Sequence, residues 1–224
     1  MRRTFVLLTT LLFIFVAKPA EAVTDNADKL IVPSGQSYTL YGKRTYNESI
    51  RIEGTLYVAA YDGGAATGTV HLSAPQLKVS GVIDANGAVL PAQTGPGAGD
   101  CAGGGAGYGG SGGDSGYSFN SNECSSEGGP SYGDPCSKTI DMGSGGGNGG
   151  GDGIGGSAGG AVTLIANTID INSSAVIAAD GQSGEPVGSD QLGAGGRIKI
   201  FYAQTADITG QISAEGGAKG GGDP

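Results

Sequence analysis

The sequence predicts an all-β protein whose fold is a right-handed parallel β-helix, a solenoid of about four coils with a long glycine-rich insertion. Three observations predict this fold. A short motif, in which an apolar residue is followed four positions later by another, usually across a glycine, occurs at residues 52–56, 79–83 and 208–212, with a longer copy at 171–177. Segments that alternate apolar with polar residues surround the motifs, as half-buried strands do. Three copies continue into similar turns at residues 84–87, 178–181 and 213–216, and such internal repetition is typical of solenoids.

Residues 1–22 are predicted to be a secretory signal peptide. Two arginines follow Met1, residues 5–17 are apolar, and Ala20-Glu21-Ala22 has the pattern of a cleavage site. The apolar run of 13 residues is shorter than the roughly 20 that span a bilayer, and no later stretch is apolar enough to do so. We therefore expect a mature chain from Val23 that is secreted, extracellular or held at the cell surface, with no membrane span. The alternative is an uncleaved anchor.

Residues 23–94 are predicted to form an N-terminal cap and the first two coils. Strands at residues 29–32, 37–41 and 49–53 would supply the cap and the first coil, because an open stack of strands needs its end covered. The second coil is expected as three strands, at residues 69–74, 76–81 and 82–85, which Pro75 and Gly81 separate.

Residues 161–219 are predicted to form the C-terminal coils, because they repeat the plan of the second coil. Aligning the copies gives three interior columns, which are Val70, Val162 and Ile198; Leu72, Leu164 and Ile200; and Ile83, Ile177 and Ile212. In a parallel stack such columns become continuous apolar ladders. At the following turns, Gly87, Gly181 and Gly216 are expected to supply the positive φ of a sharp corner.

The insertion, residues 95–160, contains 27 glycines among 66 residues. Ordering such a backbone costs about 1–2 kcal/mol per residue, and the few large side chains cannot offset this by burial, so a flexible loop is the first interpretation. The alternative is a set of packed polyproline II strands on the flank of the solenoid, because glycine recurs at every third position over residues 104–116 and 147–159. Residues 220–224 begin another such loop, from which we expect a longer repeat array.

Two kinds of covalent modification are expected. Cys101, Cys124 and Cys136 lie in the insertion, and in an oxidising compartment we expect one disulfide among them, with the pairing open. Asn47 and Asn172 begin Asn-x-Ser sequons and are candidate N-glycosylation sites if the secretory route is eukaryotic.

The chain is acidic, with a formal net charge of −9. Without the signal peptide, 9 basic residues (12 − 3) and 20 acidic residues (21 − 1) remain, for a net charge of −11. Such a chain repels phosphate backbones, which argues against nucleic acid as a partner. We expect other copies of the chain, surface or matrix components, or carbohydrate as partners.

Motifs that carry chemistry are sparse. Arg197-Ile198-Lys199 resembles a tripeptide of polygalacturonases, but the aspartate cluster and Gly-His-Gly motif of those enzymes are missing, and the one histidine is His71. We therefore expect no enzyme, and neither catalytic nor cofactor-binding residues. Residues 109–114 match the start of a glycine-rich calcium nonapeptide, which makes Asp114 the one candidate metal ligand, although a single copy is also typical of an ordinary loop.

The C-terminal three-fifths of the chain carries a family resemblance. Its stretches are Gly105-Ala-Gly-Tyr-Gly-Gly110, Gly128-Gly-Pro-Ser-Tyr-Gly-Asp134, Gly143-Ser-Gly-Gly-Gly147, Gly159-Gly-Ala-Val-Thr-Leu164, Gly193-Ala-Gly-Gly-Arg-Ile198 and Ile212-Ser-Ala-Glu-Gly-Gly217. They resemble the glycine-rich β-solenoid repeat region of large secreted or cell-surface proteins of plants, oomycetes and other protists. The resemblance implies a structural or adhesive role and supplies no catalytic residue.

We expect a non-catalytic structural or adhesive module of a cell surface or extracellular matrix, forming part of a longer array. The first alternative is a pectin-lyase-like β-helix that binds or degrades polysaccharide, which would need a groove of aromatic and acidic side chains. The second is a surface that binds cations or ice on a flat face, for which Thr69, Thr163 and Thr168 give a scattered threonine pattern.

Overall fold

The computed structural model describes residues 21–64, 67–87, 90–100, 104–108, 111–114, 127–133, 142–148, 154–184 and 193–217. Regular structure in these residues consists of strands, which confirms the all-β prediction, and no helix among them could cross a membrane. The strands are β1 Thr24–Asp25, β2 Lys29–Val32, β3 Ser37–Leu40, β4 Gly42–Thr45, β5 Ser49–Ile52, β6 Thr55–Val58, β7 Thr69–Val79, β8 Val82–Asp84, β9 Ala161–Ile171, β10 Val176–Ala178, β11 Arg197–Ile208 and β12 Gln211–Ser213.

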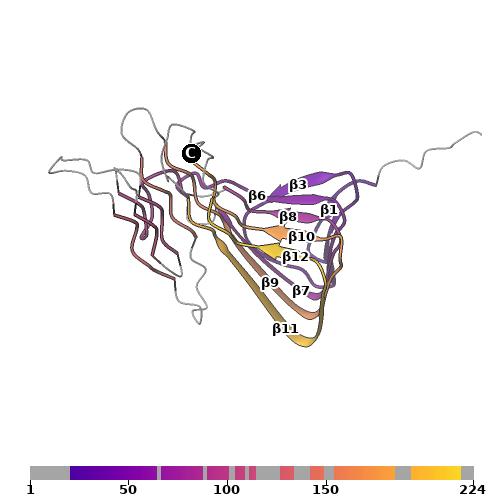
Figure 1. Ribbon diagram of the computed structural model, residues 1–224. Helices are drawn as coiled ribbons and strands as arrows, with labels where there is room; N and C mark the ends of the chain where they lie inside the picture. The colour runs from indigo at the N-terminus through magenta and orange to yellow at the C-terminus, as the bar shows by residue number, and fades with distance from the viewer. Residues whose placement is uncertain are drawn as a thin grey trace, which may run out of the picture.

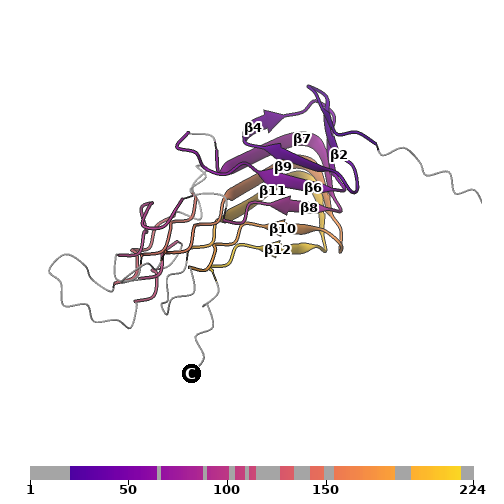
Figure 2. The ribbon, with the colours of Figure 1, turned by 90° about the horizontal axis from the view of Figure 1, so that it is seen from above.

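The strands form two sheets, and the strands of successive repeats are stacked in the same direction in both (Figures 1 and 2). The first sheet has the order β1-β2-β5-β7-β9-β11, with β4 also paired to β7, and the second has the order β12-β10-β8-β6-β3. The β1–β2 pair is antiparallel, and the other pairs are parallel. Each long strand of the first sheet therefore leads into a short strand of the second, an arrangement compatible with a β-helix-like fold.

The register of the strands confirms the three predicted columns. Val70 pairs with Val162 and Val162 with Ile198, while the columns that begin at Leu72 and Ile83 align in the same way. The side chains of Val70, Leu72 and Ile83 are fully buried. In-register parallel pairing places equivalent residues of successive repeats above one another, so the alternation in each strand becomes a continuous core.

The prediction that Pro75 separates two strands is wrong, because β7 continues through it. Ala74 pairs with Ala166 and Gln76 with Thr168, which leaves Pro75 exposed between two paired positions. Proline lacks a backbone N–H, so it removes one hydrogen bond from the ladder without ending the strand. The long strands bend at this level instead, as Figure 1 shows for β7, β9 and β11.

The turn glycines divide into two classes. The predicted positive φ is confirmed at Gly87, where φ is 54°. It is wrong for Gly181 and Gly216, which do not have a positive φ. A Cβ at Gly181 would overlap the carbonyl oxygen of Gly193, so the requirement there is space rather than backbone conformation.

The corner glycines of the repeated motif are also required by space. A Cβ at Gly81 would overlap the carbonyl oxygen of Gly54, one repeat earlier in the stack. Both amides, Gly54 N–H and Gly81 N–H, donate to the repeat above, to Val32 O and Ile52 O respectively, each at 3.0 Å. The motif therefore marks the position where successive corners stack backbone on backbone.

The core is closed at the N-terminal end of the stack, although β3, the last described strand of the second sheet there, has a neighbour on one side only. β1 runs antiparallel along β2, and the Asp25 carboxylate accepts hydrogen bonds from the hydroxyl groups of Tyr38 (2.9 Å) and Tyr46 (3.0 Å). Behind β1, Leu30 and Val32 of β2 are completely buried. The outermost apolar side chains at this end are therefore covered by the chain itself.

The glycine-rich segments form a bundle beside the strands (Figures 1 and 2) and are hydrogen-bonded to one another. Three consecutive amides of one segment donate to three different segments: Gly145 N–H to Thr94 O (2.9 Å), Gly146 N–H to Gly156 O (2.9 Å) and Gly147 N–H to Gly104 O (2.8 Å). A β-strand pairs with two neighbours in one plane, so this three-way pattern is not that of a sheet. We call the described segments between residues 90 and 160 that bond in this way, with residues 179–184, 193–196 and 214–217, the glycine bundle.

Close backbone contact explains why the bundle needs glycine. A Cβ at Gly147 would overlap the carbonyl oxygen of Asp100, and a Cβ at Gly156 would overlap that of Gln182. Few side chains take part, although Ser144, fully buried, accepts a hydrogen bond from Gly97 N–H (3.0 Å). The interpretation of the insertion as a flexible loop therefore does not fit the described segments.

Candidate functional site

Of the predicted modification and metal-binding residues, the structure describes Asp114, Asn47 and Asn172. Asp114 is exposed, and its Oδ1 accepts a hydrogen bond from Gly128 N–H at 2.8 Å, so it joins two segments of the glycine bundle. Within the part of the chain that the structure describes, no three histidine, cysteine, aspartate or glutamate side chains gather to hold a metal ion. Cys101, Cys124 and Cys136 lie outside the described residues.

Both candidate glycosylation sites lie in turns. Asn47 is exposed, and its Nδ2 donates to Asp28 Oδ1 at 3.1 Å. The Oδ1 of Asn172 accepts from the backbone N–H (3.1 Å) and the hydroxyl (2.8 Å) of Ser174, the third residue of its own sequon. The longer copy of the repeated motif, with its two extra residues, forms this turn.

The tripeptide that resembles polygalacturonases lies at the start of β11. Ile198 and Ile200 continue interior columns, whereas Lys199 pairs with Thr163, which in turn pairs with His71 of β7. Burial, with a smaller contribution from the nearby Lys43, lowers the pKa of His71. In this row of paired residues, His71 lies between cationic and hydroxyl side chains. General acid and base catalysis on a glycoside would need carboxylates there instead.

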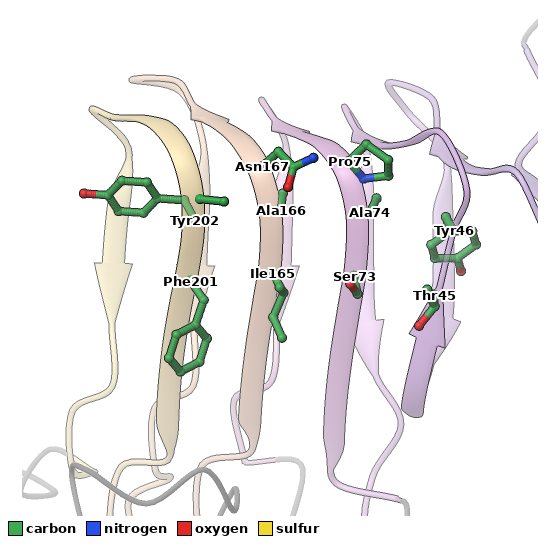
Figure 3. A pocket seen from close by; sticks show the side chains of 11 residues that line it. Thr45, Tyr46, Ser73, Ala74, Pro75, Ile165, Ala166, Asn167, Phe201 and Tyr202 are labelled. Atoms are coloured by element: carbon green, nitrogen blue, oxygen red, sulfur yellow. The ribbon is translucent and has the colours of Figure 1, made fainter.

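A cavity of about 460 Å³ lies where the long strands bend, and we call it the bend cavity (Figure 3). Its lining residues are Thr45, Tyr46, Ser73, Ala74, Pro75, Ile165, Ala166, Asn167, Phe201, Tyr202 and Ala203. All of these are uncharged, in a chain whose formal net charge is −9. The cavity therefore suits a neutral ligand better than an ionic one.

Strand register builds one side of the bend cavity. Thr45 pairs with Ser73, Ser73 with Ile165, and Ile165 with Phe201, so these side chains form one row across four strands (Figure 3). Adjacent strands are about 4.8 Å apart, so the row spans roughly 14 Å. The row presents hydroxyl groups at one end, on Thr45 and Ser73, and apolar side chains at the other end.

Two aromatic rings are exposed at the apolar end of the row. Phe201 is 47% exposed and Tyr202 is 57% exposed. Rings of this kind offer a flat apolar face, and the Ser73 hydroxyl and the Asn167 amide line the same cavity. The sequence does not predict this site, because an outward-facing residue of one strand gives no signal until the register shows which residues are its neighbours.

A second hollow, of about 540 Å³, follows the other limb of the bent strands. Register aligns a charged row there, Arg51, Lys78, Asp170 and Asp207. Lys78 Nζ and Asp170 Oδ2 are 2.9 Å apart, and this hydrogen bond raises the pKa of Lys78. The charges of this row therefore partly neutralise one another.

The threonines considered for an ice-binding face are dispersed. Thr69 pairs with Ala161, Thr163 with His71 and Thr168 with Gln76. Thr163 is also only 2% exposed. The three side chains do not form one flat threonine array.

No protein-family model, curated protein or solved structure matches this chain.

Proposed function

We propose that the chain is a right-handed parallel β-helix whose glycine bundle consists of packed polyproline II segments. In polyproline II, successive residues rotate by about 120°, so consecutive amides point in three directions. The amides of Gly145, Gly146 and Gly147, which donate to three different segments, support this. Right-handedness is supported by the strong preference of parallel crossover connections. The five-stranded second sheet suggests one coil more than the four that the sequence repeats predict.

On this basis we propose that the protein is a non-catalytic structural or adhesive module of a cell surface or extracellular matrix. The observation that supports it is the hydrogen-bonded glycine bundle, which extends the order of the strand stack into the most glycine-rich part of the chain. A module stabilised in this way holds a fixed shape over the residues that the structure describes. The apolar N-terminal segment, residues 1–22, supports export.

Expression of the full chain with a C-terminal tag in a secreting host tests this proposal. We expect the tagged protein in the cell-surface or matrix fraction, with the intact mass of a tagged chain that begins at Val23. Gly156→Ala crowds the bundle and should reduce the amount of protein in the cell-surface or matrix fraction. Gly113→Ala, with open space around its Cβ position, should not. Retention inside the cell with residues 1–22 still attached would contradict the proposal.

The bend cavity supports a second candidate function, the binding of a neutral polysaccharide. The exposed rings of Phe201 and Tyr202, in a cavity that hydroxyl and amide groups also line, would complement the apolar faces and hydroxyls of sugar rings. Affinity electrophoresis in gels that contain uncharged plant or fungal polysaccharides tests it. We expect Phe201→Ala to weaken retardation about tenfold, which corresponds to about 1.4 kcal/mol. The control is Tyr57→Ala, because Tyr57 is 44% exposed on the other sheet. Equal retardation of both variants and the parent would contradict this function, and release of sugars would point to an enzyme.

A further inference from the structure

The outer face of the long strands carries a row of polar and cationic side chains. Strand pairing joins Lys43 of β4 to His71 of β7, and His71 to Thr163 of β9. Thr163 in turn pairs with Lys199 of β11. These four residues, which we call the cationic row, alternate along their strands with residues of the interior, such as the fully buried Leu72. Because successive side chains of a strand point to opposite faces, the row lies on the side of the sheet away from the core.

The part of the sheet that carries this row contains no acidic residue. It consists of β4 and the first limbs of β7, β9 and β11, which are residues 42–45, 69–74, 161–166 and 197–202. These segments hold four of the chain's twelve lysines and arginines, in a chain whose formal net charge is −9. One of the four, Arg44, belongs to the other side of the sheet, where its Cζ lies 5.8 Å from the centre of the Tyr41 ring. The outer face therefore has a local excess of positive charge, which attracts anions.

Two members of the cationic row have no polar partner in the part of the chain that the structure describes. Lys43 is exposed and forms no ion pair with any described residue. Thr163 is 2% exposed, and its buried Oγ1 has no hydrogen-bond partner among the described residues. Buried polar atoms are hydrogen-bonded in the large majority of cases. An unpaired hydroxyl between His71 and Lys199 therefore points to a ligand that supplies the bond.

The cationic row lies next to the bend cavity on the same face. Two residues further along the strands, Lys43 is followed by Thr45 and His71 by Ser73, and both Thr45 and Ser73 line the cavity. Two residues of a strand span roughly 6.7 Å, and the row extends about 14 Å across its four strands. A polymer whose sugar rings occupy the cavity therefore has its substituents within reach of the row.

We propose that the cationic row is a subsite for the acidic groups, carboxylate or sulfate, of a matrix polysaccharide whose uncharged units occupy the bend cavity. Ammonium and hydroxyl groups donate the hydrogen bonds that such acidic groups accept. Uncharged units keep the charge density of the polymer below that of nucleic acid, which an acidic chain repels. The choice of polymer rests on the proposed polysaccharide function of the bend cavity, whereas the binding of anions rests on the row alone.

Binding of the full chain to three immobilised dextrans, one uncharged, one carboxymethylated and one sulfated, tests the subsite. We expect the parent to bind at least one acidic dextran about tenfold more tightly than the uncharged one, and the form bound more tightly identifies the acidic group. Lys43→Gln should remove most of this preference. Lys29→Gln, which removes the same charge from β2, is the matched control and should keep it. Equal binding of all three dextrans by the parent, or equal losses in the two variants, would overturn the proposal.

Two further variants separate the cationic row from the bend cavity. Thr163→Val removes the unpaired hydroxyl, which destabilises the free protein, so we expect a higher unfolding temperature together with weaker binding of the acidic dextran. Unchanged binding by this variant would contradict the placement of the subsite on this row. Phe201→Ala should weaken the binding of all three dextrans alike. If Phe201→Ala has no effect while Lys43→Gln removes the preference, the function of the cavity is wrong and the anion subsite stands.

Discussion

The strand stack and the glycine bundle reach close packing by opposite means. In the stack, side chains fill the interior, and residues such as Leu72 and Leu164 are completely buried. In the bundle, backbones fill it, and the carbonyl oxygen of a neighbouring segment occupies the space of a Cβ at Gly147 and Gly156. The same condition, an interior without voids, therefore makes the stack sensitive to the removal of atoms and the bundle sensitive to their addition.

The largest effect is expected from removing atoms in the stack. Leu164→Ala leaves a cavity in the interior column that begins at Leu72, because Leu164 lies between Leu72 and Ile200. We expect a loss of about 2–5 kcal/mol in the free energy of unfolding, measured by urea denaturation. Leu164→Met, which conserves volume, should cost less than about 1.5 kcal/mol. Equal effects of the two substitutions would show that the column is not tightly packed.

Adding one methyl group to the bundle is expected to have the next largest effect. Gly156→Ala introduces a Cβ that overlaps the carbonyl oxygen of Gln182, whereas the Cβ position of Gly113 has no atom within 4 Å. We expect Gly156→Ala to cost about 1–3 kcal/mol, and Gly113→Ala to change stability by less than about 0.5 kcal/mol. Chemical denaturation followed by the intrinsic fluorescence of the tyrosines measures both. If the two variants are equally stable, the backbones do not approach as closely as described.

A smaller effect is expected where side chains fasten the closed end. Tyr46→Phe removes the hydrogen bond to Asp25 and leaves the buried ring in place. We expect a loss of about 0.5–1.5 kcal/mol in the free energy of unfolding. Tyr57→Phe, on an exposed ring, serves as the control and should have no measurable effect.

The same tyrosine predicts a pH dependence. Burial, followed by the hydrogen bond to Asp25, raises the pKa of Tyr46 above its ordinary value of 10.0. The folded state therefore favours the neutral phenol, and its contribution to stability is complete below pH 10 and is lost as the pH rises from there toward the folded-state pKa. Thermal unfolding between pH 8 and 11 should show a steeper loss for the parent than for Tyr46→Phe. Parallel curves would contradict the assignment.

The smallest effect is expected on the exposed charged row. Asp170→Asn breaks the 2.9 Å pair with Lys78, but both side chains are largely solvated, at 43% and 55% exposure. Exposed pairs of this kind contribute little and are screened by salt. We expect an unfolding midpoint in high salt that cannot be distinguished from that of the parent. A clear difference that persists in high salt would show that the pair is structurally important.

The extent to which the sequence predicts this molecule depends on how local the signal is. The columns that begin at Val70, Leu72 and Ile83 were predictable because alternation and internal repetition together determine the register of a parallel stack. The passage of β7 through Pro75 was not, since one missing hydrogen bond can either end a strand or be absorbed by its neighbours. The period of three among the glycines is one basis of the proposed polyproline II packing, but it does not predict which segments are neighbours. The bend cavity was missed because Phe201, Ile165 and Ser73 are far apart in the chain and meet only through register.

Hydrogen exchange of the native protein, followed by mass spectrometry, tests whether backbone hydrogen bonds order the glycine bundle as firmly as the ladders order the strands. We predict that peptides covering residues 142–148 and 154–160 exchange as slowly as those covering β9. Exchange of these peptides at the rate of an unfolded chain, while β9 stays protected, would show that these hydrogen bonds do not order the bundle.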